Sequence, residues 1–423
     1  MMLVLLGVIV AFVFIIIMIR KKINFGISLI IGSMILGLFS LETITLLDIP
    51  KAIVEALIYS FSTQQIITDT IELAILTTLI FILARALQET GSINKLIKSL
   101  RRFFSQGGIL AVIPSVYGLM PVPGGALLSA PMIDEEGEKY QLTKNQKNFL
   151  NIWFRHIWES MFPVYPAMIL ITSAQFSNIN IYTLAVVNLP AYLAALFIGW
   201  YFLRKFIKHA PLQKSEQSPS NHGLIFLVPP LVPLIVYFPM ILIGLSQTRA
   251  FLIGIIVSII VLFFLTKLRL KEYLVVLKKS LTWRIAMAIF GIMIFRQMFE
   301  VTTANTIVAN LITGLPFSAL AIIILIPVVI GFLIGYNLGA IALSYFLVQP
   351  FFDVTGLSIL WTTSIVFVSA LVGYLVSPIH LCNVLSGEYL KTDTTRIYKQ
   401  FIPSAIIVLI VQVLFVVLVS GFV

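Results

Sequence analysis

The side chains best suited to chemistry lie in an apolar stretch around residue 155. Arg155, His156 and Glu159 fall within about one helical turn of one another. An ionised carboxylate in an apolar span is costly unless it is paired or binds a cation. Glu159 is therefore predicted to bind a coupling proton or Na⁺ or, alternatively, to pair with Arg155 at the i,i+4 spacing. Arg155 could bind an anion or extend its charge toward the membrane surface.

Hydroxyl, amide and imidazole side chains accompany prolines in this stretch and in a second one, 358–385. A proline removes a backbone hydrogen bond and kinks or unwinds a helix, and the freed carbonyls can then coordinate an ion. Nearby hydroxyls could add ligands to a cation, although serines also bond to carbonyls of their own helix. An imidazole there could donate to a substrate or carry a proton. The site residues predicted in the two stretches are Glu159, Ser160, Pro163, Ser377, Pro378, His380 and Asn383.

Two glycine-containing segments, 121–125 (PVPGG) and 335–339 (GYNLG), interrupt other apolar runs. Gly124 and Gly125 lack a β-carbon, so the backbone there can take a positive φ and present N–H groups to an anion, or pack closely against another helix. Asn337 can both donate and accept. Ligand contacts are therefore predicted at Pro121, Pro123, Gly124, Gly125, Asn337 and Gly339, with Na⁺ a candidate near Gly124, Ser160, Asn337 and Ser377.

The composition indicates a membrane protein. Hydrophobic residues make up 60% and charged residues 11% of the chain, and the mean hydropathy is +1.06. A soluble domain has roughly 45–50% apolar and about 25% charged residues. About ten runs are long enough to cross a hydrocarbon core of ~30 Å. They cover roughly 2–19, 25–41, 66–84, 149–175, 181–203, 223–245, 250–266, 284–303, 358–381 and 400–422.

The second half of the chain resembles the first. Arg85 and Glu89 recur as Arg296 and Glu300 about half a chain length later, and the pattern IPxxxG occurs at both 113–118 and 326–331. The two Arg/Glu pairs have the spacing of structural ion pairs. An internal repeat whose interrupted apolar segments correspond is typical of secondary transporters.

Each half contains one apolar segment that is too interrupted for a simple span. These segments are predicted to be re-entrant hairpins, because non-helical backbone at membrane depth must be buried in protein or line a cavity. Segments 50–64 and 268–280 are predicted to be interfacial helices. The predicted domains are a first inverted repeat, 1–203, with a hairpin at about 103–132 and a broken helix at about 149–175; a cytoplasmic linker, 204–222; and a second inverted repeat, 223–423, with a hairpin at about 315–352 and a broken helix at about 358–385.

Basic residues fall in alternate loops. If residues 20–22 are cytoplasmic, all but four of the 28 lysines and arginines are cytoplasmic, which places both termini outside. The exceptions are Lys51, Arg155, Arg249 and Arg296. Because the net charge of +11 is spread over these loops, a nucleic-acid partner is not expected. The predicted fold class is an all-α polytopic membrane protein with about ten transmembrane helices, two re-entrant hairpins and two inverted-topology repeats.

The segment 121–131 (PVPGGALLSAP) and the acidic loop 134–136 after it resemble an uncharacterised prokaryotic integral-membrane family. That family is placed in the ion-transporter superfamily with gluconate permeases, citrate carriers and sodium/dicarboxylate symporters. The resemblance implies a substrate site between hairpin tips and broken helices, and a homodimer that moves by an elevator motion. It also implies a prokaryotic inner membrane. The sodium/dicarboxylate branch carries Ser-Asn-Thr at its hairpin tips, which this chain lacks.

The favoured function is secondary active transport of a small organic anion of the carboxylate type, driven by Na⁺ or H⁺. The alternatives are an intramembrane enzyme acting on lipid or peptide, and a channel. An enzyme would need a positioned nucleophile and base, and His156 with Glu159 is the nearest approach to one. Besides a coupling ion, no cofactor is expected. Cys382 is the one cysteine, so neither a disulfide nor a cluster of thiolates for a metal is expected.

Overall fold

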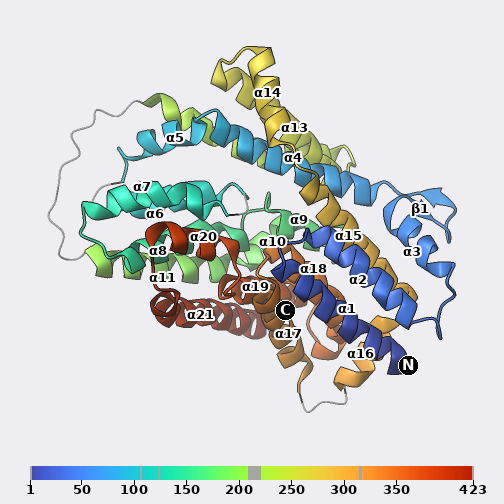
Figure 1. The fold of residues 1–423 in the computed structure, drawn as a ribbon. Coiled ribbons are helices and arrows are strands. Elements are labelled where there is room, and N and C mark those ends of the chain that lie inside the picture. The colour runs from blue at the N-terminus through green and yellow to red at the C-terminus, as the bar shows by residue number, and fades with distance from the viewer. Residues whose placement is uncertain (1, 105–106, 122–123, 208–220, 314–316, 422–423) are drawn as a thin grey trace. The chain divides into compact units, whose positions relative to one another are not determined.

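The chain is almost entirely helical in the computed structural model, which describes residues 2–104, 107–121, 124–207, 221–313 and 317–421 (Figure 1). The first half contains α1 (Met2–Arg20), α2 (Phe25–Phe39), α3 (Asp48–Leu57), the strand pair β1 (Tyr59–Ser60) and β2 (Gln65–Ile66), α4 (Asp69–Glu89), α5 (Ser92–Leu100), α6 (Ile109–Gly118), α7 (Ala126–Glu138), α8 (Lys144–His156), the 3-10 turn η1 (Ile157–Ser160), α9 (Pro166–Thr172), α10 (Ile181–Val187) and α11 (Leu189–Ile207).

The second half contains a comparable series of elements. It contains η2 (Asn221–Leu227), α12 (Val228–Leu242), α13 (Gln247–Thr266), α14 (Leu270–Ser280), α15 (Trp283–Val301), α16 (Ala304–Thr313), α17 (Ala319–Ile334), α18 (Asn337–Val348), the turns η3 (Gln349–Phe351) and η4 (Asp353–Thr355), α19 (Ile359–Leu375), α20 (Leu381–Leu390) and α21 (Thr394–Ser420). Both halves have, in this order, two apolar helices, a short helix, a helical hairpin and an interrupted helix.

Five of the described helices are long and apolar enough to cross a membrane, or seven if two bent pairs each form one span. The bent pairs are α10 with α11, at 48°, and α15 with α16, at 72°. An all-α membrane protein is confirmed, but ten uninterrupted spans are not found among the described residues. The sequence estimate was too high because apolar runs do not reveal breaks: α2 has only 15 residues, and the runs at 149–175 and 358–381 are split.

Polar side chains begin several helices by accepting hydrogen bonds from N–H groups that have no partner within the helix. Thr143 forms a capping box with Gln146 at the start of α8. The hydroxyl of Ser318 accepts from the Ala321 N–H at 3.2 Å and begins α17. Local sequence therefore determines where one interrupted helix and one hairpin begin.

The first of two compact units is built on the contact between α2 and α15, which α1 and α3 flank (Figure 1). Glycines bring these backbones together, because a methyl group at Gly26 would overlap the Met287 carbonyl. In the same unit, a methyl at Gly373 would overlap the Val328 carbonyl, so α19 and α17 also touch through their backbones. The unit consists of Met1–Thr78, Leu170–Ile179 and Thr282–Tyr374.

The second compact unit contains α7 and α8, which contact each other and both contact α6 and α20, and the packed pairs α11 with α21 and α12 with α13. Gln412 of α21 holds the bend between α10 and α11. Its amide nitrogen donates to the Val187 carbonyl at 2.9 Å, and its amide oxygen accepts from the Ala191 N–H at 3.0 Å. The unit consists of Leu79–Ile169, Asn180–Leu281 and Leu375–Val423.

Both predicted re-entrant segments fold as helical hairpins. In the second unit, α6 packs against α7, with the turn between them partly outside the described residues. In the first unit, α17 packs against α18 around Gly335, whose φ of 64° closes α17. The acidic segment 134–136, predicted as a loop, belongs instead to α7, which continues to Glu138.

Both predicted broken helices are interrupted. The first loses its helix between Ser160 and Pro166, and the second between Leu375 and Leu381. The predicted interfacial segment 268–280 is the helix α14, whereas the segment 50–64 is helical only to Leu57 and then forms β1, which pairs with β2. The predicted linker 204–222 lies largely outside the described residues.

The opposite orientation that the sequence predicts for the two hairpins can be tested directly. Single cysteines at Lys139, after α7, and at Ser318, before α17, in a Cys382→Ser background should react with an impermeant thiol reagent from opposite faces of oriented vesicles. Lys21→Cys serves as the reference for the cytoplasmic side, which Lys139→Cys should share. Labelling of Lys139→Cys and Ser318→Cys from one face would contradict the inverted repeat.

Candidate functional site

Three elements of the second unit meet where α8 ends, and a buried polar network holds them in register. The Asn151 side chain of α8 donates to the Ala126 carbonyl, at the start of α7, and to the Ser386 hydroxyl of α20, both at 2.8 Å. Ser129 donates to the Asn151 amide oxygen at 2.5 Å. Because buried polar groups are costly when unpaired, this network fixes the relative positions of the three helices.

A second link between α7 and α8 lies at their other ends. Lys147 is 1% exposed and its ammonium group bonds to Asp134 at 2.8 Å and also to Glu138. Burial acts to lower the pKa of Lys147, but the hydrogen bonds to these two carboxylates outweigh it and raise the pKa. Lys147 therefore stays charged and anchors α7 on α8.

The Arg155 guanidinium lies against the tip of the α6–α7 hairpin. A β-carbon at Gly125 would lie 2.8 Å from Cζ of Arg155, so the absence of a side chain there makes room for the guanidinium. Nη1 of Arg155 donates to the Tyr117 carbonyl at 3.2 Å, in the last turn of α6. Arg155 is 2% exposed, so it does not extend to the membrane surface, which was one of its two predicted positions.

The backbone of Arg155 also lies close to the hairpin, at Gly118 of α6. A methyl group at Gly118 would overlap the Arg155 carbonyl. Gly118 and Gly125 therefore enclose Arg155 from two directions, the first by contact with its backbone and the second by contact with its charged group.

The tip glycines differ from each other. Gly124 has a φ of 70°, in the left-handed region that favours glycine, whereas Gly125 has a φ of −58° and precedes α7. Of the two roles considered for these glycines, a positive φ applies to Gly124, whereas Gly125 provides space for a side chain from another helix. Leu385 of α20 packs on Gly124, where a β-carbon would lie 2.8 Å from its Cδ1.

Glu159 lies in η1 and is 3% exposed. Its Oε1 accepts a hydrogen bond from the Tyr165 hydroxyl at 2.9 Å and lies 3.8 Å from Nε2 of His156. Glu159 is thus a buried acceptor beside the helix break. Tyr165 was not predicted, and its position two residues after Pro163 is the only signal of it in the sequence.

The remaining predicted residues of the interrupted helices form hydrogen bonds near the two breaks or lie within them. Ser160 donates to the Ile157 carbonyl at 3.3 Å, which is the alternative role considered for it. Tyr398 links the second break, since its hydroxyl donates to the Ser377 carbonyl at 3.0 Å and accepts from Asn383 at 2.9 Å. Pro163 is buried within the unwound segment, whereas Pro378 is exposed.

The predicted site residues do not all belong to one unit. Asn337, the first residue of α18, and Gly339 belong to the first unit, where both are buried. A β-carbon at Gly339 would lie 2.8 Å from Cε2 of Phe25, so this glycine makes room for an aromatic ring. Pro121 is buried in the second unit, and Pro123 lies outside the described residues.

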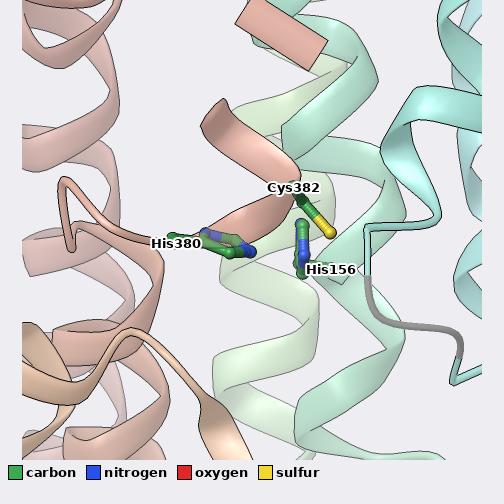
Figure 2. Close-up of side chains that lie close together, drawn as sticks. All are labelled: His156, His380 and Cys382. Atoms are coloured by element: carbon green, nitrogen blue, oxygen red, sulfur yellow. The ribbon is translucent and has the colours of Figure 1, made fainter. Parts of the chain in front are cut away.

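His156, His380 and Cys382 form a buried cluster that the sequence analysis did not predict (Figure 2). His156 ends α8, whereas His380 and Cys382 begin α20. The two imidazole rings cross with centroids 4.8 Å apart. One cysteine cannot form a cluster of thiolates, but here a single thiol lies with two imidazoles that the sequence places far from each other.

The ion pairs predicted at the ends of the repeats are found in only one half. Arg296 and Glu300 of α15 approach to 3.8 Å. No ion pair joins Arg85 to Glu89 within the described part of α4. The repeat of the Arg-x-x-x-Glu pattern therefore does not reflect one shared interaction.

Comparison with known proteins assigns the chain to a family. The model of the family described as "Protein of unknown function (DUF401)" matches residues 2–419. The chain belongs to this family. No curated protein matches it. Among solved structures, this DUF401 protein is similar to the crystal structure of the Alcanivorax borkumensis YdaH transporter, described as having an unusual topology. That similarity has a TM-score of 0.60 at 13% identity, and covers 89% of each chain.

The two glycines around Arg155 should respond differently to one added methyl group. Gly118→Ala meets backbone and should destabilise the protein by about 1–3 kcal/mol, as overpacking does. Gly125→Ala meets the end of a long side chain, which can shift, and should cost less. Thermal unfolding in detergent measures both, with Gly421→Ala as the control because its nearest neighbours lie 3.7 Å away. If Gly118→Ala and Gly125→Ala lose the same stability, the Arg155 guanidinium resists displacement as strongly as the backbone does.

Proposed function

We propose that the protein is a secondary active transporter that moves a small organic anion of the carboxylate type across the cytoplasmic membrane, coupled to Na⁺ or H⁺. The observation that carries the proposal is the burial of the Arg155 guanidinium against the hairpin tip. A charged side chain buried in the apolar interior of a membrane protein is energetically costly and is usually retained for a function. A guanidinium is the side chain best suited to bind a carboxylate, since its planar donors match the two oxygens.

The start of α7 adds to this preference for an anion. Gly125 directly precedes α7, so the first N–H groups of that helix point toward the hairpin tip. Helix N-termini carry a partial positive charge and favour anions. The arginine and the helix end together support a negatively charged substrate.

The charges of Arg155 and Glu159 supply a physical basis for coupling. With the guanidinium and the carboxylate both ionised, the pair has no net charge when nothing is bound. Binding a monovalent anion at Arg155 and a cation at Glu159 leaves it neutral again, whereas binding only one of them leaves a net charge in an apolar interior. A buried net charge is costly. Empty and fully loaded carriers would therefore change conformation more readily than half-loaded ones.

The architecture supports transport as the class of function. The Alcanivorax borkumensis YdaH protein, whose solved structure is similar, is described as a transporter. The repeated order of elements, with a hairpin and an interrupted helix in each half, fits alternating access by two inverted repeats. We therefore propose an elevator-type motion in a homodimer of the prokaryotic inner membrane, with both termini outside.

Transport is tested with purified protein in proteoliposomes. A thermal-shift screen of small organic acids, with and without Na⁺ and at several pH values, should find a carboxylate that stabilises the protein. That compound, radiolabelled, should show counterflow and leave the vesicles chemically unchanged. A converted product would indicate an enzyme, and flux without counterflow would indicate a channel.

Arg155→Lys keeps the charge but loses the planar donor pair, so it should remain folded and reduce transport of the stabilising acid by about tenfold or more. Arg249→Lys, at an exposed arginine of α13, is the matched control and should transport normally. If Arg155→Lys transports as well as the unchanged protein, Arg155 does not bind the substrate.

A further inference from the structure

The cluster of His156, His380 and Cys382 has the donors of a metal site. One ligand atom from each of the three side chains can be chosen so that all lie within 4.8 Å of one another, and all three residues are buried. The rings and the thiol come from two different helices, α8 and α20, and lie together in Figure 2. Neither the proposed transport of an anion nor its coupling ion uses Cys382.

The spacing is close to that of a bound ion. In a tetrahedral zinc site the Zn–N distance is about 2.0–2.1 Å and the Zn–S distance about 2.3 Å, so neighbouring ligand atoms are roughly 3.3–3.6 Å apart. Side-chain rotations that shift the donor atoms by about 1 Å would therefore bring the three donors to that spacing. His380 and Cys382 are only two residues apart at the start of α20, so both move with the same turn of backbone.

The hydrogen bonds of His156 prepare one nitrogen for a metal. Nδ1 of His156 lies 2.6 Å from the Ile152 carbonyl, and since a carbonyl only accepts, Nδ1 carries the proton. In the neutral ring the lone pair is then on Nε2. A histidine that binds a metal usually donates its other ring N–H to a group such as a backbone carbonyl, which fixes the orientation of the ring.

The thiol of Cys382 is positioned to bind a cation together with the imidazoles. The sulfur of Cys382 and one nitrogen of His156 lie within 4.8 Å of each other. A cation that binds both atoms replaces the thiol proton, which is released as the thiolate forms.

The donor set selects the class of ion. Thiolate and imidazole favour Zn²⁺ and Cu⁺, whereas Mg²⁺ and Ca²⁺ prefer oxygen ligands. Glu159, 3.8 Å from Nε2 of His156, is near enough to provide an oxygen as a fourth ligand. The adjacent Arg155 opposes a cation, but the carboxylate and the thiolate together outweigh its single charge.

We propose that His156, His380 and Cys382 bind a thiophilic d¹⁰ cation, Zn²⁺ or Cu⁺, which joins the end of α8 to the start of α20. Binding needs no substrate, so it can be tested whether or not the protein transports an anion. Because the site links the two interrupted helices, an occupied site should also stabilise the folded protein.

The test uses the intact, tag-free protein in detergent with its thiol reduced. Co²⁺, as a spectroscopic substitute for Zn²⁺, should give a thiolate-to-metal charge-transfer band in the near ultraviolet and visible bands of a tetrahedral site. Zn²⁺ should remove these bands, and Mg²⁺ and Ca²⁺ should not. Competition with a colorimetric Cu⁺ chelator in the absence of oxygen decides between the two ions, and tight binding of either supports the site.

Variants assign the ligands. Cys382→Ser should abolish the charge-transfer band, and His156→Gln or His380→Gln should weaken binding by about tenfold or more. The matched control, Cys382→Ser with Ser358→Cys, keeps one thiol but moves it to an exposed position of the first unit, and should not restore the band. Size-exclusion profiles and melting temperatures in a chelator establish that each variant is folded.

Protection of the thiol gives a second measurement that does not depend on these variants. Zn²⁺ or Cu⁺ should slow alkylation of Cys382 in the unchanged protein, and a chelator should reverse the effect. The proposal is overturned if neither ion protects Cys382, or if the band and its affinity are the same in folded Cys382→Ser.

Discussion

The contact between the Arg155 guanidinium and Gly125 is the interaction on which the second unit depends. The guanidinium occupies space that any side chain at Gly125 would fill, and it bonds to the last turn of α6. It therefore connects both helices of the hairpin to the end of α8. The polar network around Asn151 and the ion pair of the buried Lys147 hold α7 against α8 at two further points along these helices. The helices that position the Arg155 guanidinium are therefore themselves fixed.

The break after α8 follows from the same need to satisfy buried polar groups. Pro163 and Pro166 have no N–H to donate, so carbonyls before them lose helical partners. Asn188 donates to the Ser160 carbonyl at 2.9 Å, and Tyr165 in the unwound segment turns its hydroxyl to Glu159. The break thus exchanges backbone hydrogen bonds for side-chain ones, and in doing so it gives a buried carboxylate a donor.

The sequence predicted the architecture better than the contacts. The hairpins and the interrupted helices were found because proline and glycine mark breaks directly, as at Pro163 and Gly335. The number of spans was overestimated, since an apolar run looks alike whether α8 is continuous or stops at His156. The role of Gly125 depends on a side chain from another helix, and the Cys382 cluster joins residues more than half the chain apart. Spacing along the chain contains no information about either contact.

The central claim is that Arg155 and Glu159 are kept as buried charges because they bind an anion and its coupling ion. The most direct measurement compares each single neutral variant with the double variant Arg155→Met, Glu159→Gln, in thermal stability and in transport of the stabilising acid. Each single change leaves one uncompensated charge and should destabilise the protein, while the double change should restore stability but not transport. A double variant that transports with unchanged ion dependence would show that the two charges only neutralise each other.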